Sequence, residues 1–427
     1  MNGSAARNRK ASEKTDETLI VAVDAAKDKH NLYTEIGDEV VEKEFANRSD
    51  VIEAELTAVR DRALAAGYTE LWFLCEPSGG CERTLMKTAR RLGFETAWAN
   101  GETVAQLRVV ESNDTGKTDI KDPRVIYLLG RLEKTQKHRE LEAPYSLLRQ
   151  WHAIYIAAEE GAAAAKCAVH RQLALLFPDY SFKKDFMFGP SGRALHEKFG
   201  SNPYRIVAAG RRRFEMVMRK AVGRIQKKSL ERLWRDADLS VRHGVDERLL
   251  AVQEKHLTQL FENLDLHLGR KAEAARHMEK LYAEARELDL KLPEAEHKVV
   301  STFHLARLIA VTGPLSDFQT VRELWRFLGL NLRERQSGKY RGKTRISKKG
   351  NPDGRLVVSQ SVLPLVRHDR LFGAAYHQKR KQGMPGSKAM TVMMRRFVKM
   401  IFGMYRSGKK FDPFRVFLSE SQYRLAA

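Results

Sequence analysis

The chain has 427 residues and carries 76 Lys and Arg against 54 Asp and Glu, which gives a formal net charge of +22. Charged residues make up 30% and apolar residues 43%, so the composition is globular and wholesale disorder is excluded. No apolar run approaches the roughly 18 residues that a membrane-spanning helix needs, which excludes an integral membrane protein. The length predicts about two to four domains.

The positive charge is the first indication of function. A surplus of this size favours a polyanionic partner such as nucleic acid, although general solubility is the alternative explanation. The three cysteines, Cys75, Cys81 and Cys167, form no CxxC pair, so we expect a reducing cytosol and neither a disulfide framework nor a zinc ribbon. Residues 1–17 are polar and lack periodicity, which predicts a disordered leader and no secretory signal.

Residues 18–144 predict an α/β domain. Apolar runs predict buried strands at 19–23, 71–75 and 94–98, and two more strands, 31–36 and 40–45, joined by a turn at Gly37-Asp38. Helices are expected near 49–65, where Ser49 is the predicted N-cap, and near 82–92, 103–110 and 123–132. The resulting order, β-β-β-α-β-α-β-α, is the layout of the ribonuclease-H-like (RuvC-like) fold.

Residues 145–293 predict an almost entirely helical region. A long helix is expected over 146–177, followed by shorter helices in a basic insert at about 180–245, for which contact with RNA is one interpretation. A second long helix over 246–290 has apolar residues at heptad spacing. Coiled-coil pairing and packing within its own domain explain that spacing equally well. Pro293 is expected to end the helix.

Residues 294–427 predict a third, mostly helical domain. Helices near 296–311 and 317–328 flank a turn at Thr312–Leu315, and further helices are expected near 355–366 and 387–405. Between these pairs lies a segment rich in Arg, Lys and Gly. From Arg333 to Arg355 it holds nine Lys and Arg but only two acids.

Four acidic residues predict a metal site. Asp24 ends the first strand and Glu76 ends the fourth, so in neighbouring parallel strands both would emerge at one sheet edge. Asp119 and Asp122 are three residues apart and share a face if the segment is helical. Such converging carboxylates would repel without a divalent cation, and Mg²⁺ or Mn²⁺ suits hard oxygen ligands and phosphate chemistry. Turn and capping roles remain open for each acid, Asp122 before Pro123 being a good N-cap.

Ser337 is a candidate nucleophile within the basic segment. It precedes Gly338 and is flanked by cations that could stabilise its alkoxide and the charge of an attacked phosphate. The alternative is a flexible loop that grips a nucleic-acid backbone, with Ser337 as one hydrogen-bond donor. The candidate nucleic-acid-binding cations are Arg333, Arg335, Lys339, Arg341, Lys343, Arg345, Lys348 and Lys349.

The four acids followed far downstream by Ser337-Gly338 resemble the DEDD transposases of the insertion-sequence one-ten family and the related Piv-type DNA invertases. The resemblance covers the chain after the leader. The segments that carry it are Val21–Lys27, Glu76–Gly80, Lys117–Asp119 with Asp122, Phe327–Leu330, Ser337-Gly338, Arg345–Asn351, Gly383, Lys388-Ala389 and Tyr405-Arg406.

This resemblance implies a RuvC-like domain, a coiled coil and a C-terminal transposase domain that bears the serine. It implies that Mg²⁺ held by the acids, and the serine of another domain or subunit, together form the active site of a site-specific recombinase. The serine would form a phosphoserine link to DNA, and a bridge RNA would choose donor and target DNA. A homo-oligomer on DNA in the bacterial cytoplasm, associated with the nucleoid, is also implied.

Two other functions remain open from the sequence. A metal-dependent nuclease or branched-DNA resolvase would use the acids with water as nucleophile, and Ser337 would then only assist binding. A non-catalytic nucleic-acid-binding protein would need no divalent ion. The acids at two strand ends argue against a non-catalytic nucleic-acid-binding protein, because carboxylates repel a phosphate backbone unless a cation lies between them.

Overall fold

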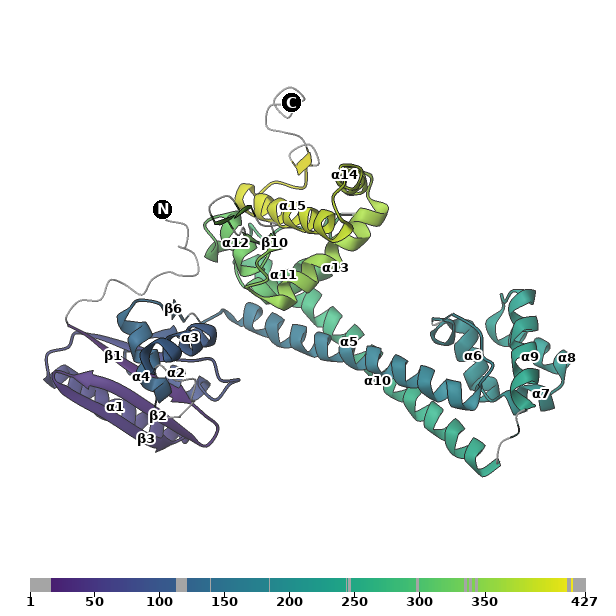
Figure 1. Ribbon diagram of the computed structural model, residues 1–427, viewed down its shortest axis with the longest axis horizontal. Coiled ribbons are helices and arrows are strands. Elements are labelled where there is room, and N and C mark those ends of the chain that lie inside the picture. The colour runs from purple at the N-terminus through teal and green to yellow at the C-terminus, as the bar shows by residue number, and fades with distance from the viewer. Residues whose placement is uncertain are drawn as a thin grey trace, which may run out of the picture. The chain divides into compact units, whose positions relative to one another are not determined.

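The computed structural model describes residues 17–112, 121–138, 140–183, 185–242, 244, 247–296, 299–333, 336–337, 340–341, 345–412 and 416–417. The chain folds into two compact units (Figure 1). The first contains the described residues of 1–143, 291–300 and 312–427, and the second those of 144–290 and 301–311. None of the described helices is long and apolar enough to span a membrane.

The N-terminal part of the first unit is an α/β layer structure. Its described strands form one mixed sheet in the order β3-β2-β1-β4-β5-β6. β2 runs antiparallel to its neighbours β1 and β3, whereas β4 and β5 run parallel to β1. The elements are β1 (Thr18–Ala25), β2 (Lys29–Ile36), β3 (Glu39–Ala46), α1 (Ser49–Ala65), β4 (Glu70–Cys75), α2 (Arg83–Arg91), β5 (Glu95–Trp98), α3 (Gly101–Ser112), α4 (Lys121–Arg131) and β6 (Gln136–Lys137).

Side chains alternate between the two faces of this sheet, and each face has its own core. Leu19, Val21 and Val23 of β1 pack with α1 and α2 on one face. Ile20 and Ala22 pack with α3 and α4 on the other. Because both faces are covered, the central strands are apolar throughout, as the runs at 19–23 and 71–75 predicted. The predicted strands and helices of this region are confirmed.

The structure differs from the prediction in three details. Ser49 is the first residue of α1 and not its N-cap; Arg48 holds that position and makes no side-chain cap hydrogen bond. The short edge strand β6, which pairs antiparallel with β5, was not predicted because two residues carry no periodicity. α4 begins at Lys121, so Asp122 lies inside its first turn and does not precede it.

His138, next to β6, should make stability depend on pH. Burial and the neighbouring Arg90 guanidinium lower the pKa of His138 from 6.5 to about 4. The folded state therefore favours the neutral imidazole, and stability present above pH 6.5 is lost as the pH falls towards 4. We expect the unfolding free energy to drop by about 1–2 kcal/mol from this residue, given its partial exposure. Urea unfolding of wild type and His138→Asn across this range would measure the difference, and identical pH profiles would contradict the assignment.

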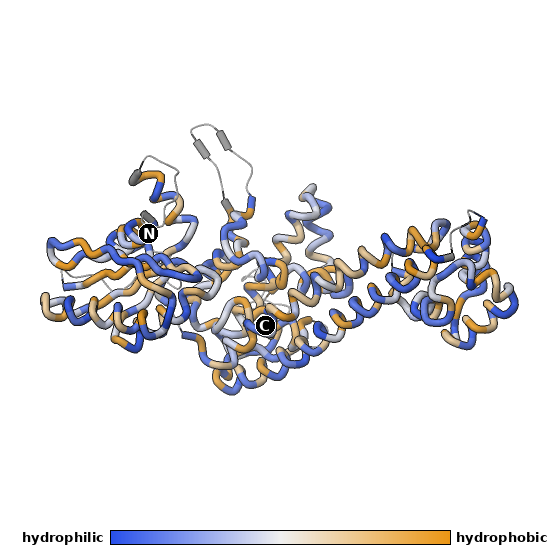
Figure 2. The backbone as a smooth tube through the Cα atoms, turned by 90° about the horizontal axis from the view of Figure 1, so that it is seen from below, coloured by the Kyte–Doolittle hydropathy of each residue, from blue (hydrophilic) through white to orange (hydrophobic). Residues whose placement is uncertain are grey.

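The second unit is built on two long antiparallel helices, α5 (Ala143–Leu176) and α10 (Glu247–Leu288). They run side by side (Figure 1), and their pairing is fixed by Lys271 Nζ to Glu159 Oε1 at 2.9 Å and by Trp151 stacked on His277 at 4.0 Å. Their hydropathy alternates along the chain, as expected for amphipathic helices (Figure 2). Most apolar heptad positions of α10 are buried within this chain, although Leu268 is exposed, and coiled-coil pairing stays a prediction.

Short helices between α5 and α10 form a compact cap with its own apolar core. They are η1 (Phe186–Phe188), α6 (Pro190–Phe199), α7 (Pro203–Ala208), α8 (Arg211–Val222) and α9 (Lys227–Val241). The breaks at Gly189-Pro190 and Asn202-Pro203 lie where the sequence placed them. In both helices that follow, proline takes a position in the first turn.

The C-terminal region consists of α11 (Thr302–Thr312), η2 (Leu315–Asp317), α12 (Val321–Phe327), α13 (Pro352–His368), α14 (Arg370–Lys381) and α15 (Gly386–Ser407), with the strands β7 (Leu332–Arg333), β8 (Gln336–Ser337), β9 (Tyr340–Arg341) and β10 (Arg345–Ile346) between α12 and α13. α11 starts later than predicted because Glu296 and Val300 form a β-bridge ahead of it. α14 was not predicted; Asp369 caps it through the backbone N–H groups of Leu371 and Phe372.

Candidate active site

Asp24 and Glu76 lie at the ends of neighbouring parallel strands. β1 pairs with β4 so that Val23 is opposite Cys75, and Asp24 and Glu76 are the next residues on each strand. Adjacent strands are about 4.8 Å apart. Val23 and Cys75 face the core under α1 and α2, so alternation directs the two carboxylates to the face covered by α3 and α4. The predicted meeting of strands at one sheet edge is confirmed.

Gly101, the first residue of α3, makes room for the Glu76 carboxylate. A Cβ atom at position 101 would be 2.2 Å from Glu76 Oε1, which is closer than atoms can approach. The side chain of Asn100 caps the helix by accepting from the backbone N–H groups of Glu102 and Thr103. Glu76 is therefore held against the start of α3, a contact that no motif in the sequence indicated.

Gly101→Ala should displace the Glu76 carboxylate and lower activity on DNA strongly while costing little stability. Because the clash involves the end of a flexible side chain, Glu76 can move aside and the fold should survive. Gly269→Ala in α10 is a matched control, since a Cβ there meets nothing within 4 Å. The control should gain up to about 1 kcal/mol of stability with unchanged activity. Strand-cleavage rates and thermal unfolding of both variants would measure this, and full activity of Gly101→Ala would contradict it.

The loops that follow the two strands are fixed by side chains that sequence reasoning missed. Asn47 Nδ2 donates to the carbonyls of Ala26 and Lys27, behind Asp24. Behind Glu76, the buried Glu82 accepts from Ser78 N, Ser78 Oγ and Gly80 N through one carboxylate oxygen. Burial alone would raise the pKa of Glu82, but these hydrogen bonds bring it below its ordinary value.

Asp122 lies on the same face of the sheet but is already paired. Its Oδ1 is 2.5 Å from Nη2 of Arg108, which α3 supplies, and the carboxylate is almost fully buried. Asp119 lies outside the described residues. Within the described ranges, no three His, Cys, Asp or Glu side chains gather into a metal-binding group. Asp24 and Glu76 are thus brought together, while the complete four-acid set stays a prediction.

Ser337 lies at the end of a short strand and not in an irregular loop. β8 pairs antiparallel with β9, and Ser337 is opposite Tyr340. Nearer the helices, β7 pairs with β10 through Arg333 and Arg345. The described backbone therefore forms a hairpin with two paired segments, β7 with β10 at its base and β8 with β9 beyond them. Ser337 lies towards the tip of this hairpin. Three of the candidate cations have described, exposed side chains: Arg345, Lys348 and Lys349. For Arg333 and Arg341 the structure describes the backbone. The other three, Arg335, Lys339 and Lys343, lie outside the described residues.

The base of this hairpin is tightly held. Nη1 of Arg355 lies within 3.1 to 3.5 Å of four backbone carbonyl oxygens at the two ends of the segment, those of Leu328, Lys348, Gly350 and Asn351. Gly350 packs so closely that a Cβ would be 2.5 Å from the Phe327 carbonyl oxygen and 2.6 Å from Gly329 N. Lys348 adopts a positive φ of 54°, a conformation that costs free energy outside glycine. The segment is therefore anchored at residues 328 and 348–351.

An ion pair in the first unit joins this base to α3. Lys349 Nζ is 2.6 Å from Glu102 Oε1, next to the glycine that contacts Glu76. Both side chains are more than half exposed, at 65% and 57%, so the pair itself contributes little stability.

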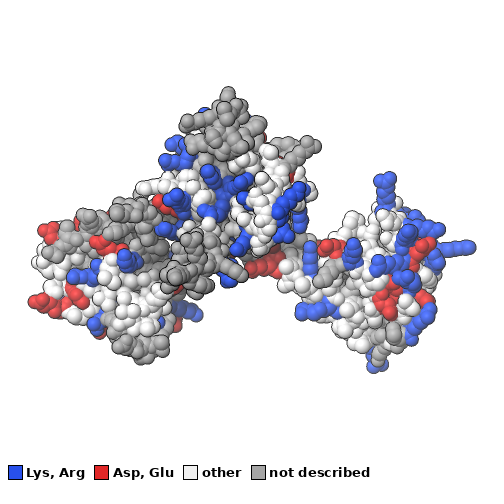
Figure 3. Space-filling view, turned by 45° about the horizontal axis from the view of Figure 1, so that its top comes forward, with Lys and Arg blue, Asp and Glu red and all other residues white. Residues whose placement is uncertain are grey.

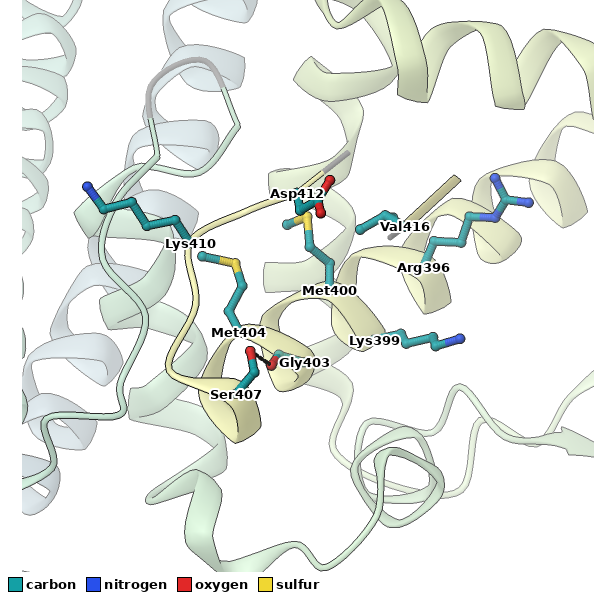
Figure 4. Close-up of a pocket in the computed structure, with 9 residues that line it drawn as sticks. All are labelled: Arg396, Lys399, Met400, Gly403, Met404, Ser407, Lys410, Asp412 and Val416. Atoms are coloured by element: carbon teal, nitrogen blue, oxygen red, sulfur yellow. Dashed lines mark hydrogen bonds between the residues drawn. The ribbon is translucent and has the colours of Figure 1, made fainter. Parts of the chain in front are cut away.

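α15 carries a separate pocket (Figure 4). Met400 and Met404 lie in it, while Lys399 and Lys410 extend in opposite directions and Ser407 Oγ donates to the Gly403 carbonyl at 2.8 Å. None of the predicted site residues lines this pocket, so it belongs to a different surface of the chain.

Comparison with known proteins assigns the C-terminal region. Residues 295–377 match the family model described as Transposase IS116/IS110/IS902 family. Among curated proteins, none matches the chain. The matched segment contains Ser337 and all eight candidate cations, whereas the four candidate acids lie outside it. The resemblance drawn from the sequence is therefore confirmed through this segment, which is similar to the transposases of the IS116/IS110/IS902 family.

Proposed function

We propose that the protein is the site-specific recombinase of an insertion sequence, which cuts and rejoins DNA through a Mg²⁺- or Mn²⁺-dependent acidic site and a nucleophilic Ser337. The transposase match over residues 295–377 supports the reaction class. The observation that supports the chemistry is the parallel pairing of β1 with β4, because Asp24 and Glu76 directly follow the paired residues Val23 and Cys75.

The N-terminal sheet supports a RuvC-like assignment. Three antiparallel strands followed by two that run parallel to the first, in the order β3-β2-β1-β4-β5, is the arrangement expected of a ribonuclease-H-like domain. In that assignment the acids at the ends of β1 and β4 belong to the catalytic site, and α3 and α4 cover the face on which they lie.

The donor set fits a hard divalent cation. Asp24 and Glu76 offer carboxylate oxygens, and the space left by Gly101 positions one of them. Asp119 and Asp122 would complete the ligand set, and Asp122 must exchange the Arg108 guanidinium for the cation. When bound, the cation would neutralise charge on the scissile phosphate and stabilise the departing oxygen.

The serine would perform the covalent step. Its Oγ attacks the DNA phosphorus and forms an O–P bond as the bond from phosphorus to one sugar oxygen breaks. The serine proton ends on that departing oxygen, so the step needs no oxidant, reductant or cofactor beyond the cation. Attack by a sugar hydroxyl of a second strand reverses the step, releases the serine and joins the new strands. The cations around Ser337 would hold the phosphate during both steps.

Two partners follow from this proposal. Donor and target DNA are the substrates, and a structured bridge RNA would select them, for which the net charge of +22 leaves ample capacity. A homo-oligomer on DNA, a dimer or a tetramer, would let the serine of one subunit act beside the acids of another.

The decisive experiment traps the intermediate. Protein, guide RNA and both DNA partners are mixed with Mg²⁺, quenched in denaturant and examined for protein covalently joined to labelled DNA. The proposal expects such an adduct, its loss on chelation and its return with Mg²⁺ or Mn²⁺. Cleaved DNA without any adduct would instead support the metal-dependent nuclease with water as nucleophile, and joining that persists after chelation would end the metal assignment.

A further inference from the structure

The cap of the second unit carries exposed cations that no acid neutralises. We define this cationic surface by six residues of α8, the turn after it and the first turn of α9: Arg212, Arg213, Arg219, Lys220, Arg224 and Lys228. Their side chains are exposed, and among the described residues none forms an ion pair. Figure 3 shows many Lys and Arg side chains, with some Asp and Glu between them, on the surface of the second unit.

Several other cations of the same unit, by contrast, form ion pairs. Arg193 contacts Asp265 at 2.5 Å, Arg205 contacts Glu254 at 3.0 Å and Arg242 contacts Asp238 at 2.6 Å. At a distance, the electrostatic field of a paired cation is largely cancelled by that of its acidic partner. The field of an unpaired cation is not cancelled in this way. The cap thus presents a net positive face on α8.

The helix holds these cations in one rigid array. Arg212, Arg213, Arg219 and Lys220 share a face, because they are separated by intervals of about two helical turns. The opposite face is anchored by Phe214 and Met218, both fully buried, with the Phe214 ring packed on Phe199 and Trp234. The cations therefore point away from a fixed support.

Helix stability explains the positions of Arg219 and Lys220, which lie in the last turn of α8, but not those of the cations in the first turns of α8 and α9. The first turns of α8 and α9 contain Arg211 to Arg213, and Lys227 and Lys228, with no acid in either turn. Positive charge near a helix N-terminus opposes the helix dipole and costs roughly 0.3–1 kcal/mol per charge. A partner of opposite charge would offset that cost.

We infer that the cationic surface on α8 binds the backbone of duplex DNA outside the cut sites, independently of sequence. From Arg212 to Lys220 the helix advances about 12 Å, close to the width of the B-DNA major groove, so its two ends match phosphates on opposite sides of that groove. The narrow major groove of A-form RNA fits such an array less well. Arg and Lys, which the exposed face of α8 carries, contact phosphate oxygens whatever the base sequence.

The test compares two variants that lose the same charge. One carries Arg212→Gln, Arg213→Gln, Arg219→Gln and Lys220→Gln. The control carries Arg48→Gln, Arg62→Gln, Lys198→Gln and Arg242→Gln, which are exposed cations that form ion pairs. Binding of the full chain to duplex DNA of arbitrary sequence, and to an RNA duplex of equal length, is measured by fluorescence anisotropy over a salt series without divalent ions.

The surface variant should bind DNA at least about tenfold more weakly, and its salt slope should fall by about 3 to 4, since each phosphate contact contributes about 0.9. The control should change far less. A variant with Lys at all four positions should retain binding. Equal losses in both variants, a larger loss on RNA than on DNA, or failure of the Lys variant would overturn the inference. Because the assay needs no cleavage, it is independent of whether Ser337 or the acids are catalytic.

Discussion

Replacing Ser337 with Ala should abolish the protein–DNA adduct and strand joining while leaving DNA affinity within about twofold of wild type. This substitution removes the proposed nucleophile but leaves the cations that hold the phosphate. DNA binding should therefore be retained while the covalent step is lost. Removal of a nucleophilic serine from an enzyme site lowers turnover by at least about a thousandfold. Denaturing electrophoresis of labelled DNA measures the adduct, and sequencing of the joined product measures recombination.

Two neighbouring serines provide matched controls for this prediction. Ser347 donates its hydroxyl to the Lys349 carbonyl at 3.4 Å, and Ser359 lies on α13, so neither has the setting of Ser337 beside a glycine in the hairpin. Ser347→Ala and Ser359→Ala should both retain the adduct. An adduct that survives Ser337→Ala and disappears in one of the controls would transfer the covalent role to that serine.

The N-terminal sheet could be predicted because its signals are local. Five runs of apolar or alternating residues correspond to β1 to β5, and an acid follows the apolar run of β1 and that of β4, which pair in parallel. Both faces of the sheet are covered, so a short apolar run can only be a buried strand. The position of Asp24 beside Glu76 then follows from strand register without knowledge of any side-chain contact.

The surroundings of the acids could not be predicted, because they depend on contacts distant in sequence. Nothing near Glu76 indicates that Gly101 must lack a Cβ, and nothing near Asp122 identifies Arg108 as its partner. Likewise, the anchoring of the serine hairpin by Arg355 involves carbonyl groups, which every residue possesses and which leave no trace in composition. The spacing of residue types in the sequence identifies candidate site residues. The charge state of these side chains, and the space available to them, are determined by the tertiary structure.

Glu76→Gln and Asp24→Asn should each lower DNA cleavage by at least about a hundredfold, because charge stabilisation by a held cation is worth several kcal/mol and 1.36 kcal/mol is a factor of ten. DNA binding without divalent ions should be retained or slightly tightened, since each change removes a negative charge close to the proposed phosphate position. Cleavage rates with Mg²⁺ and filter binding in chelator measure the two effects separately.

A second readout tests the cation without using activity. A metal that binds the folded state raises the unfolding midpoint in proportion to the logarithm of its concentration. Mg²⁺ should therefore stabilise the wild type and leave Glu76→Gln unaffected, while the control Asp38→Asn, at an exposed turn on the far side of β2, should respond like the wild type. If Mg²⁺ stabilised all three proteins equally, the acids at the strand ends would not be its ligands. Asp24 and Glu76 would then act only through their charge on the face covered by α3 and α4.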